Sequence, residues 1–332
     1  MDQPTRPSLG SHGENLSIMI PTYNCATYLR MTLQSLLEQG DAIRDAHIEI
    51  IDDVSTKDDP AAVVREMMPG RAVFWQQPKN VGVTRAMNTC VARAQREWVH
   101  ILHGDDIMYP GAYREFGQCI DLVPDCQAVF ARPLNIDADD IVDSAGFMLG
   151  TGVRGRLTYK PYDWRLNPLQ FAAVLVSRSA YRQVGPFDES FCHVADWNMW
   201  WRIVMAVPVA YSNRCIAGYR IFATNNTATL RRSGTNVREM REQLDRMMQS
   251  QREINGSITR EDLQFYQMTY DFALGQTARY LDDQEGFTAN LKQVTAYPRQ
   301  VRSFWKEFVL RVRRARRRLG LPSITDRKAE AD

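Results

Sequence analysis

The sequence predicts an α/β protein built on a doubly wound, mainly parallel sheet. Short apolar runs alternate with helical patterns over its first third, and these runs end in polar or acidic residues. Strands that alternate with helices pair in parallel within one sheet. The chain has 332 residues, of which 44% are hydrophobic and 24% charged, enough to bury a large core.

The first two strand and helix pairs are visible in the spacing of apolar residues. A run at Leu16–Ile20 leads into a turn-like Pro21–Asn24, and leucines at helical spacing follow at positions 29, 33, 36 and 37. A second run, His47–Ile51, ends in Asp52 and Asp53. The polar stretch after these acids leads into another helical candidate.

The next two strands are expected at Ala72–Trp75 and Trp98–Leu102. Between them lies a clear amphipathic helix, with one apolar face formed by Val83, Ala86, Met87, Cys90, Val91 and Ala94. In doubly wound sheets, ligands bind beyond the carboxyl ends of the strands. Tyr23, Asp53 and the pair Asp105-Asp106 each follow such an end, so we expect them to converge on one cleft.

The rest of the chain divides into further regions. Residues from Tyr159 to Phe222 are less regular, and from Asn236 onward the apolar period is helical, so we place a domain boundary near Ser233. The expected organisation is a disordered lead at 1–15, an α/β domain at 16–233, a helical region with a basic tail at 234–320 and a disordered end at 321–332.

Charge and motifs narrow the function classes. The 41 basic and 39 acidic residues nearly cancel, and no nucleic-acid-binding signature is present, so we expect no nucleic acid partner. The first strand lacks G-x-G-x-x-G and no P-loop occurs, which disfavours dinucleotide oxidoreductases and P-loop enzymes. Arginines crowd Arg311–Arg318 beside aromatic residues, which favours an anionic membrane surface as partner of residues 301–320; a nucleic-acid contact or a plain solvated end remain the alternatives.

The six cysteines lack C-x-x-C spacing and are interpreted as free thiols in a reducing cytosol. The first residues lack the apolar run of a signal peptide, and no stretch reaches the roughly 20 apolar residues of a membrane span. We therefore expect a cytoplasmic protein, peripheral at the inner face of the membrane if the basic tail binds there.

Asp105-Asp106 is the strongest candidate site. Adjacent carboxylates in a cleft repel each other unless a cation neutralises them, and oxygen ligands suit Mg²⁺ or Mn²⁺, which bridge protein carboxylates and substrate phosphates. The alternative is a helix cap beside a solvated acid. The Asp53 carboxylate could accept a hydrogen bond from a nucleobase imide while Tyr23 stacks on the base.

Several segments in order resemble glycosyltransferase family 2, the inverting enzymes of the GT-A fold, through about residue 225. They are Leu16–Asn24, Ile50–Thr56, Asn80–Gly82 with Arg85 and Asn88, His103–Asp106, Val184–Phe191 and Ala195–Trp197. The resemblance implies that the α/β domain is a GT-A glycosyltransferase domain. It also implies nucleotide-binding roles for Pro21, Tyr23, Asp53, Arg85 and Asp105.

By the same resemblance, Asp105 and Asp106 would hold Mn²⁺ or Mg²⁺, and Asp196 would be the general base. The implied reaction moves a sugar from a nucleotide diphosphate donor, with UDP favoured, to a hydroxyl of a saccharide or lipid-linked saccharide in bacterial-type surface polysaccharide or glycolipid assembly. Asp196 precedes an aromatic helix, and a helix N-terminus tends to lower the pKa of a carboxylate. Capping without chemistry is the alternative role.

Four positions depart from the family pattern. They are Val54 for a glycine, His103 for the first aspartate of Asp-x-Asp, Ala195 for a glutamate and Phe222 for a histidine. Coordination would then depend on Asp105 and Asp106. The departures leave open an alternative, a degenerate, non-catalytic GT-A protein that only binds sugar nucleotides, and metal-dependent hydrolysis of a nucleotide sugar would distinguish the two.

Overall fold

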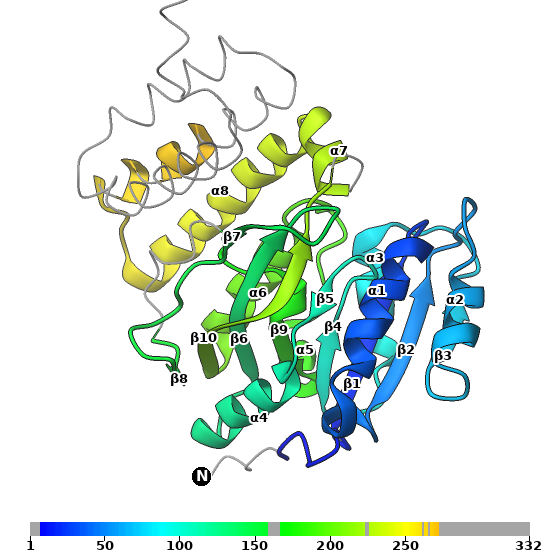
Figure 1. Ribbon diagram of the computed structural model, residues 1–332. Helices are drawn as coiled ribbons and strands as arrows, with labels where there is room; N and C mark the ends of the chain where they lie inside the picture. Colours follow the sequence, from blue (N-terminus) through cyan, green and yellow to red (C-terminus); the bar gives the residue numbers. More distant parts are fainter. Residues whose placement is uncertain (1–6, 159–166, 223–225, 261, 265, 272–332) are drawn as a thin grey trace, which may run out of the picture. The chain divides into compact units, whose positions relative to one another are not determined.

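The computed structural model describes residues 7–158, 167–222, 226–260, 262–264 and 266–271 (Figure 1). The chain divides into two compact units, Met1–Phe222 and Ala223–Asp332. This division lies before the boundary expected near Ser233. Phe222 belongs to the first unit because its ring packs against Tyr28, with 4.9 Å between ring centroids.

Ten strands of the described residues form one sheet in the order β3-β2-β1-β4-β9-β6-β10-β5, with β7 beside β6 and β8 beside β10. In chain order they are β1 (Leu16–Thr22), β2 (His47–Asp52), β3 (Val73–Gln76), β4 (Trp98–Ile101), β5 (Ile107–Met108), β6 (Ala128–Ile136), β7 (Val142–Ala145), β8 (Arg154–Arg156), β9 (Val174–Ser177) and β10 (Val209–Arg220).

The first half of the sheet is parallel, as the sequence predicts. β1 lies between β2 and β4 and runs parallel to both, and β3 continues the parallel set beyond β2. β1 is buried along its whole length, which explains why its sequence is a nearly continuous apolar run. The four strands expected from apolar runs are confirmed, with ends shifted by one or two residues.

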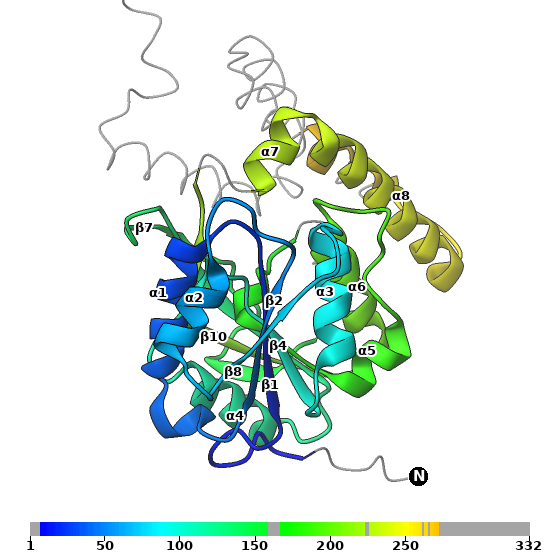
Figure 2. The same ribbon diagram turned by 90° about the vertical axis from the view of Figure 1, so that its right-hand side faces the viewer.

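Helices cover both faces of the sheet. They are α1 (Ala26–Leu37), α2 (Pro60–Met67), α3 (Val83–Arg93), α4 (Ala112–Leu122), α5 (Arg178–Val184) and α6 (Ala195–Ala206), with short 3₁₀ helices η1 (Gly40–Ile43) and η3 (Phe171–Ala173). Figure 2 shows α1 and α2 on one face and α3, α5 and α6 on the other. The order in which strands are added to the sheet therefore reverses between β1 and β4. In doubly wound sheets, ligands bind at this switch point.

The second half of the sheet is mixed, so the expected parallel pairing holds only for the first half. β9 runs antiparallel to both β4 and β6, and β10 is parallel to β6 but antiparallel to β5 and β8. The apolar run at Phe171–Val176 was visible in the sequence. A short apolar run carries no signal of strand direction, and the neighbours of β9 come from distant parts of the chain.

Residues 7–15 have defined contacts instead of the disorder that we expected for 1–15. The indole Nε1 of Trp98 donates to the Pro7 carbonyl at 2.8 Å, and the Asn15 amide donates to the Leu9 carbonyl at 3.1 Å. Leu9 is buried in the main hydrophobic core. This apolar anchor holds a segment whose glycines and prolines suggested a loose lead; residues 1–6 lie outside the described residues.

The second unit begins with α7 (Asn226–Arg232) and α8 (Thr235–Asn255). Leu244 and Met247 of α8 are buried, in line with the helical period predicted from Asn236 onward. Within the described part of the chain, none of the helices combines the length and apolar character that a membrane crossing needs. The basic tail at 301–320 and the end at 321–332 lie outside the described residues.

Candidate functional site

The loops after β1, β2 and β4 meet at one edge of the sheet. The Asp53 amide donates to the Thr22 carbonyl at 2.9 Å, and the Gly104 amide donates to the Pro21 carbonyl at 3.1 Å. The end of β1 therefore holds the loops that follow β2 and β4. The expected convergence of three strand ends is present in the structure.

Pro21 and Tyr23 differ in what they can offer a ligand. Pro21 is buried within β1, and its carbonyl is already occupied by Gly104. Tyr23 is 51% exposed, so its ring can stack on a planar base. A nucleotide-binding role for Pro21 would thus be to shape the loop, whereas Tyr23 is open to direct contact.

Asp52, the last residue of β2, forms hydrogen bonds that hold the surrounding loops. Its buried carboxylate accepts from the Ser55 amide at 3.0 Å, the Ser55 hydroxyl at 2.5 Å and Gln76 Nε2 at 2.9 Å. The Ser55 hydroxyl also accepts from the Asn24 amide at 2.8 Å, and Asn24 Oδ1 accepts from the Thr56 amide at 2.8 Å. These bonds join the β1 and β2 loops into one rigid network.

Asp53 lies at the N-terminus of α3. Its carboxylate oxygens accept from the amides of Val81 at 2.8 Å and Gly82 at 2.9 Å, while its own carbonyl accepts from Asn80 Nδ2 at 2.8 Å. Burial raises the pKa of Asp53 above its ordinary value and Asp52 adds to the rise, although the two amide bonds oppose it. Each oxygen retains a lone pair, so a base imide could still bind.

Val54 adopts a backbone conformation that suits glycine. Its φ is 65°, in the left-handed region, where a β-branched residue is a genuine outlier. The bonds from Ser55 to Asp52 span this residue and hold it there. The valine at this departure from the family pattern therefore strains the loop directly after Asp52 and Asp53.

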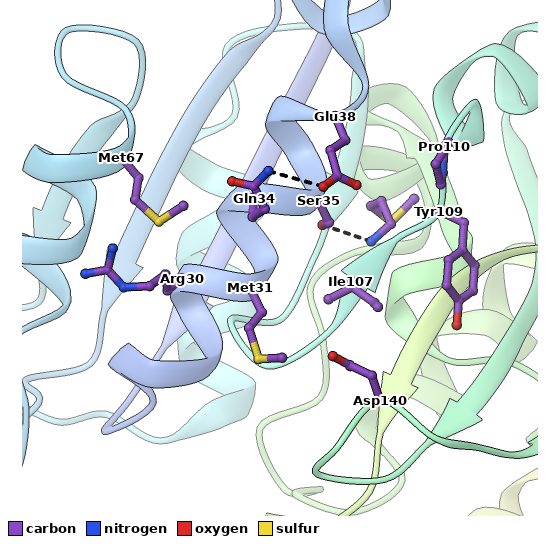
Figure 3. A pocket seen from close by; sticks show the side chains of 11 residues that line it. Arg30, Met31, Gln34, Ser35, Glu38, Met67, Ile107, Tyr109, Pro110 and Asp140 are labelled. Carbon is purple, nitrogen blue, oxygen red and sulfur yellow. Dashed lines mark hydrogen bonds between the residues drawn. The ribbon is translucent and has the colours of Figure 1, made fainter.

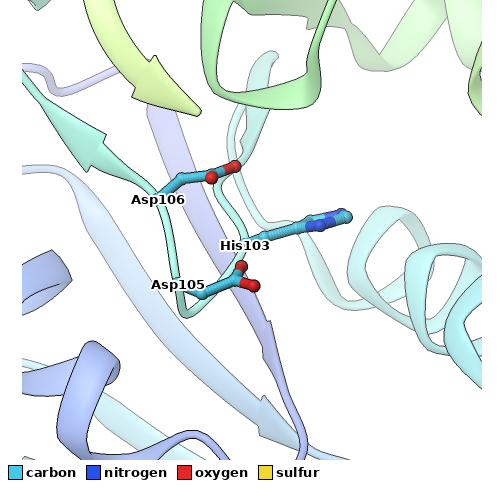
Figure 4. A group of neighbouring side chains, drawn as sticks. All are labelled: His103, Asp105 and Asp106. Atoms are coloured by element: carbon cyan, nitrogen blue, oxygen red, sulfur yellow. The ribbon is translucent and has the colours of Figure 1, made fainter. Parts of the chain in front are cut away.

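The segment His103–Asp106, called the metal motif because it is the expected cation site, brings three side chains together in the loop between β4 and β5 (Figure 4). One ligand atom each from His103, Asp105 and Asp106 lies within 4.8 Å of the others. Asp106 Oδ2 and His103 Nε2 are buried and accept or donate no hydrogen bond among the described residues. A cation would supply the missing partners.

Burial sets the protonation of this cluster. It raises the pKa of Asp105 to about 6 and that of Asp106 well above its ordinary value, with the Asp105 charge adding to the second shift. Burial also lowers the pKa of His103 to about 4, which keeps the imidazole neutral near pH 7. Desolvation of the charged forms is the main cause of both carboxylate shifts, and a bound cation would oppose it.

Arg220, at the end of β10, organises the same loop. Its amide donates to Asp106 Oδ1 at 3.0 Å, and its fully buried guanidinium donates to the carbonyls of Asp105 at 2.9 Å and Asp137 at 3.1 Å. The guanidinium also pairs with the Asp140 carboxylate at 2.7 Å. Arg220 thus fixes the backbone of the metal motif while leaving the Oδ2 atom of Asp106 open.

Asp196 occupies the first turn of α6, as expected for a helix N-terminus. It accepts from the Trp197 amide and from Asn167 Nδ2, both at 2.7 Å. Burial raises its pKa to about 6, and the hydrogen bonds oppose the shift. The expected lowering by the helix terminus is therefore wrong in sign, because desolvation of the charged form outweighs it.

Arg85 forms an ion pair with Glu189 of the segment Val184–Phe191. Its Nε lies 2.7 Å from a carboxylate oxygen of Glu189, and both side chains are about half exposed. One turn further along α3, Asn88 donates to the Phe187 carbonyl at 3.0 Å and accepts from the Phe187 amide at 2.8 Å. An approach of Arg85 to a diphosphate would require it to leave Glu189.

Aromatic contacts connect the metal motif to α6. The ring of His103 stacks on Phe171 with 4.7 Å between centroids and 26° between planes. Phe171 in turn contacts Trp200 of α6 at 5.1 Å and Phe187 at 5.7 Å. The helix that carries Asp196 is therefore linked to the metal motif by packed side chains.

A groove of about 540 Å³ lies away from these residues, between α1 and the segment around β5 (Figure 3). Arg30, Met31 and Glu38 line it from α1, and Tyr109 from the other side. None of the predicted site residues lines it. Asp140, which lines the groove, also pairs with Arg220.

Two residues of the site were not singled out from the sequence. Asn167 comes from an irregular region and gave no signal. Arg220 belongs to the segment Tyr219–Phe222, which resembles the closing motif of the family. In this segment only Phe222 was singled out from the sequence. An arginine that ends a buried strand is a usable signal, because a buried guanidinium requires several acceptors.

Comparisons with known proteins agree with this architecture. Residues 17–132 match the family model of Glycosyl transferase family 2. An uncharacterized protein of Mycobacterium tuberculosis is 30% identical over 126 residues, which are 38% of this chain and 38% of that protein. Chondroitin synthase of Escherichia coli is 27% identical over 219 residues, 64% of this chain and only 30% of the synthase. The chain thus spans a minor part of both relatives.

Solved structures share the fold at low sequence identity. Residues 1–349 of S. aureus TarS, in complex with UDP-GlcNAc, have a TM-score of 0.57 and 14% identity, and the match covers 88% of this chain and 92% of that fragment. The mannosyltransferase PcManGT of Pyrobaculum calidifontis, in complex with GDP-Man and Mn²⁺, has a TM-score of 0.51 and 14% identity, covering 89% and 79%. Residues 17–132 thus match glycosyltransferase family 2, and the chain shares the GT-A fold of these solved structures.

Proposed function

We propose that this protein is an inverting glycosyltransferase that moves a sugar from a nucleotide diphosphate donor to an acceptor hydroxyl with the help of Mn²⁺ or Mg²⁺. The observation that carries the proposal is the pair Asp105-Asp106 at the switch point of the sheet, where a buried oxygen of Asp106 has no partner among the described residues. A third carboxylate, the partly buried Asp196, lies on a helix that is packed against the same motif through Trp200 and Phe171.

The donor is proposed to be a UDP-sugar. Tyr23 would stack on the base, Asp53 would accept from its imide, and Asp105 with Asp106 would hold the metal that neutralises the diphosphate as it leaves. TarS in complex with UDP-GlcNAc and PcManGT in complex with GDP-Man support a sugar nucleotide as ligand, although they differ in the base.

The transfer would be a single displacement with Asp196 as the base. The acceptor oxygen bonds to the anomeric carbon as the bond from that carbon to the diphosphate oxygen breaks, and the hydroxyl proton passes to the Asp196 carboxylate. One displacement inverts the anomeric configuration. A pKa of about 6 suits this role, because the carboxylate is ionised at neutral pH yet basic enough to take a proton.

The acceptor is proposed to be a saccharide or lipid-linked saccharide in polysaccharide or glycolipid assembly, and the similarity to chondroitin synthase supports this class. The test is a calorimetric and product assay. UDP, GDP and dTDP are titrated with Mn²⁺ or with EDTA, and UDP-sugars are then incubated with oligosaccharide acceptors. Equal UDP affinity with EDTA and Mn²⁺ would contradict the metal role. Metal-dependent binding without hydrolysis or transfer would indicate a binding protein.

We also propose a cytoplasmic location, with attachment to an anionic membrane surface through residues 301–320. The support is the sequence alone, in which six arginines lie between Arg311 and Arg318. Replacing these arginines with glutamine in the full chain should reduce sedimentation with phosphatidylserine vesicles, since each contributes on the order of 1 kcal/mol near such a surface. Unchanged sedimentation would contradict the proposal.

A further inference from the structure

The metal motif of this chain offers a ring nitrogen beside its two carboxylates. His103, Asp105 and Asp106 follow one another within four positions of a single loop, and one ligand atom of each lies within 4.8 Å of the others. Gly104 makes the tight loop possible: a Cβ there would lie 3.1 Å from both Thr22 Oγ1 and Cys25 Sγ. The loop is therefore pressed against the end of β1, and the three side chains share one side of it (Figure 4).

Two atoms of this group lack the partners that buried polar atoms normally have. Asp106 is only 1% exposed, and its Oδ2 accepts no hydrogen bond among the described residues, although its Oδ1 accepts from the Arg220 amide. His103 Nε2 is likewise buried without a partner. Unpaired buried polar atoms are uncommon in folded proteins, and an unoccupied ligand position is one physical reason for them.

The imidazole is also held in place. It stacks on Phe171, and Phe171 is itself fixed between Trp200 and Phe187. A ligand that is fixed before the metal arrives loses little freedom when it coordinates. A surface histidine that met the carboxylates by chance would have no such support.

We infer that His103 is a third protein ligand of the metal, and that its nitrogen makes the site select Mn²⁺ and related first-row transition ions over Mg²⁺. The inference rests on the proposed function, because a donor diphosphate would complete the coordination. Mg²⁺ binds oxygen ligands and water, whereas imidazole suits transition ions. An all-carboxylate motif would lack this preference.

Two variants separate ligation from packing. His103→Asp restores an all-oxygen set, and His103→Phe keeps an aromatic ring on Phe171 but removes the nitrogen. Both should lose roughly 10- to 100-fold in Mn²⁺ affinity in the presence of UDP, the range by which metal sites respond to altered ligand support. His103→Asp should in addition gain Mg²⁺ affinity, so it should narrow the ratio of Mn²⁺ to Mg²⁺ affinity further than His103→Phe does. The melting temperature of His103→Phe should stay near that of the parent.

The direct readout is electron spin-echo envelope modulation of Mn²⁺ bound to the protein with UDP. The parent should show ¹⁴N modulation that changes on labelling with ¹⁵N-histidine and disappears in both variants. Mn²⁺ and UDP bound together without nitrogen modulation would overturn the inference and leave the proposed function intact. Absence of any metal-dependent UDP binding would overturn both. Equal Mn²⁺ and Mg²⁺ affinity in the parent would also overturn the inference.

Discussion

The carboxylate pairs at the ends of β2 and β4 look alike in the sequence but differ in the structure. Asp52 accepts three hydrogen bonds and Asp53 accepts two, all from the surrounding protein. Asp106 accepts one, and its other oxygen is buried without a partner. The first pair is mainly used to hold loops together, whereas the second is held by Arg220 and left open to a cation.

The difference indicates that a strand-end acid is available to a cation only where the protein supplies few donors. At β2, Ser55 provides donors within the same loop, and the N-terminus of α3 provides two more from a distant part of the chain. At β4, the neighbouring donor Arg220 binds chiefly backbone carbonyls. Substitutions in the two pairs and at Asp196 and Val54 should therefore affect different properties, and five predictions test the comparison.

The largest effect is expected at Asp106. Asp106→Asn should abolish the metal-dependent part of UDP binding, because the amide cannot give the cation a charged oxygen, and should cost little stability since the carboxylate is costly to bury charged. Calorimetry with Mn²⁺ and with EDTA measures it. The control is Asp139→Asn on an exposed loop. Retained metal dependence would remove the distinction between the two pairs.

The next effect concerns the third carboxylate, Asp196. Asp196→Asn should lower transfer by about 10²- to 10⁴-fold while UDP affinity is kept. The parent rate should fall as pH drops through about 6, where the base becomes protonated, and this limb should vanish in the variant. Asp188→Asn, in the same segment, is the control. Near-parental transfer would exclude Asp196 as the base.

The same substitution has a stability consequence of defined sign. The folded-state pKa of Asp196 lies at about 6, above its ordinary 3.8, so the folded state binds more protons between these values. The contribution of Asp196 to stability therefore decreases as pH rises through this window. The melting temperature of Asp196→Asn relative to the parent should be higher at pH 8 than at pH 5.

At the β2 pair the expected loss is stability. Asp52→Asn replaces one acceptor oxygen with a donor that faces Ser55 or Gln76, and an unsatisfied buried group costs about 1–3 kcal/mol. Urea unfolding measures the change. Metal preference should not alter, and Mn²⁺-dependent UDP binding that fell as far as in Asp106→Asn would show that the two pairs act alike.

The smallest effect is expected at Val54. Val54→Gly should stabilise the fold by up to about 1 kcal/mol, because relief of left-handed strain, about 1–2 kcal/mol, exceeds the added entropy of the unfolded chain. The melting temperature reports it, with Val63→Gly in α2 as a control that should destabilise. A lower melting temperature for Val54→Gly would mean that the valine side chain contributes packing that outweighs its strain.

The sequence predicted the parallel half of the fold because each of its strands is a separate apolar run followed by a helix. It did not predict the mixed half, since the direction of β9 depends on neighbours far away in the chain. The convergence of Tyr23, Asp53 and Asp105 followed from strand order alone. Parallel neighbours place their ends together without any knowledge of side-chain contacts.

Contacts across the chain were beyond the sequence. The pairing of Arg85 with Glu189 and the hold of Arg220 on the metal motif depend on tertiary packing. The pKa of Asp196 was expected to be low from its helix position, but its burial could not be read from the residues around it. Local position therefore indicated the candidate groups, and tertiary structure set their properties.

Helix α3 has one further consequence. Its first turn is held by Asp53, and its side is hydrogen-bonded to Phe187 and Phe191 through Asn88 and Thr84. One short helix therefore fixes the distance between the loop that carries Asp53 and the segment Val184–Phe191. A chimera that takes the segment equivalent to Val184–Phe191 from a relative should take α3 from the same relative. The segment would otherwise lose its hydrogen bonds to Thr84 and Asn88.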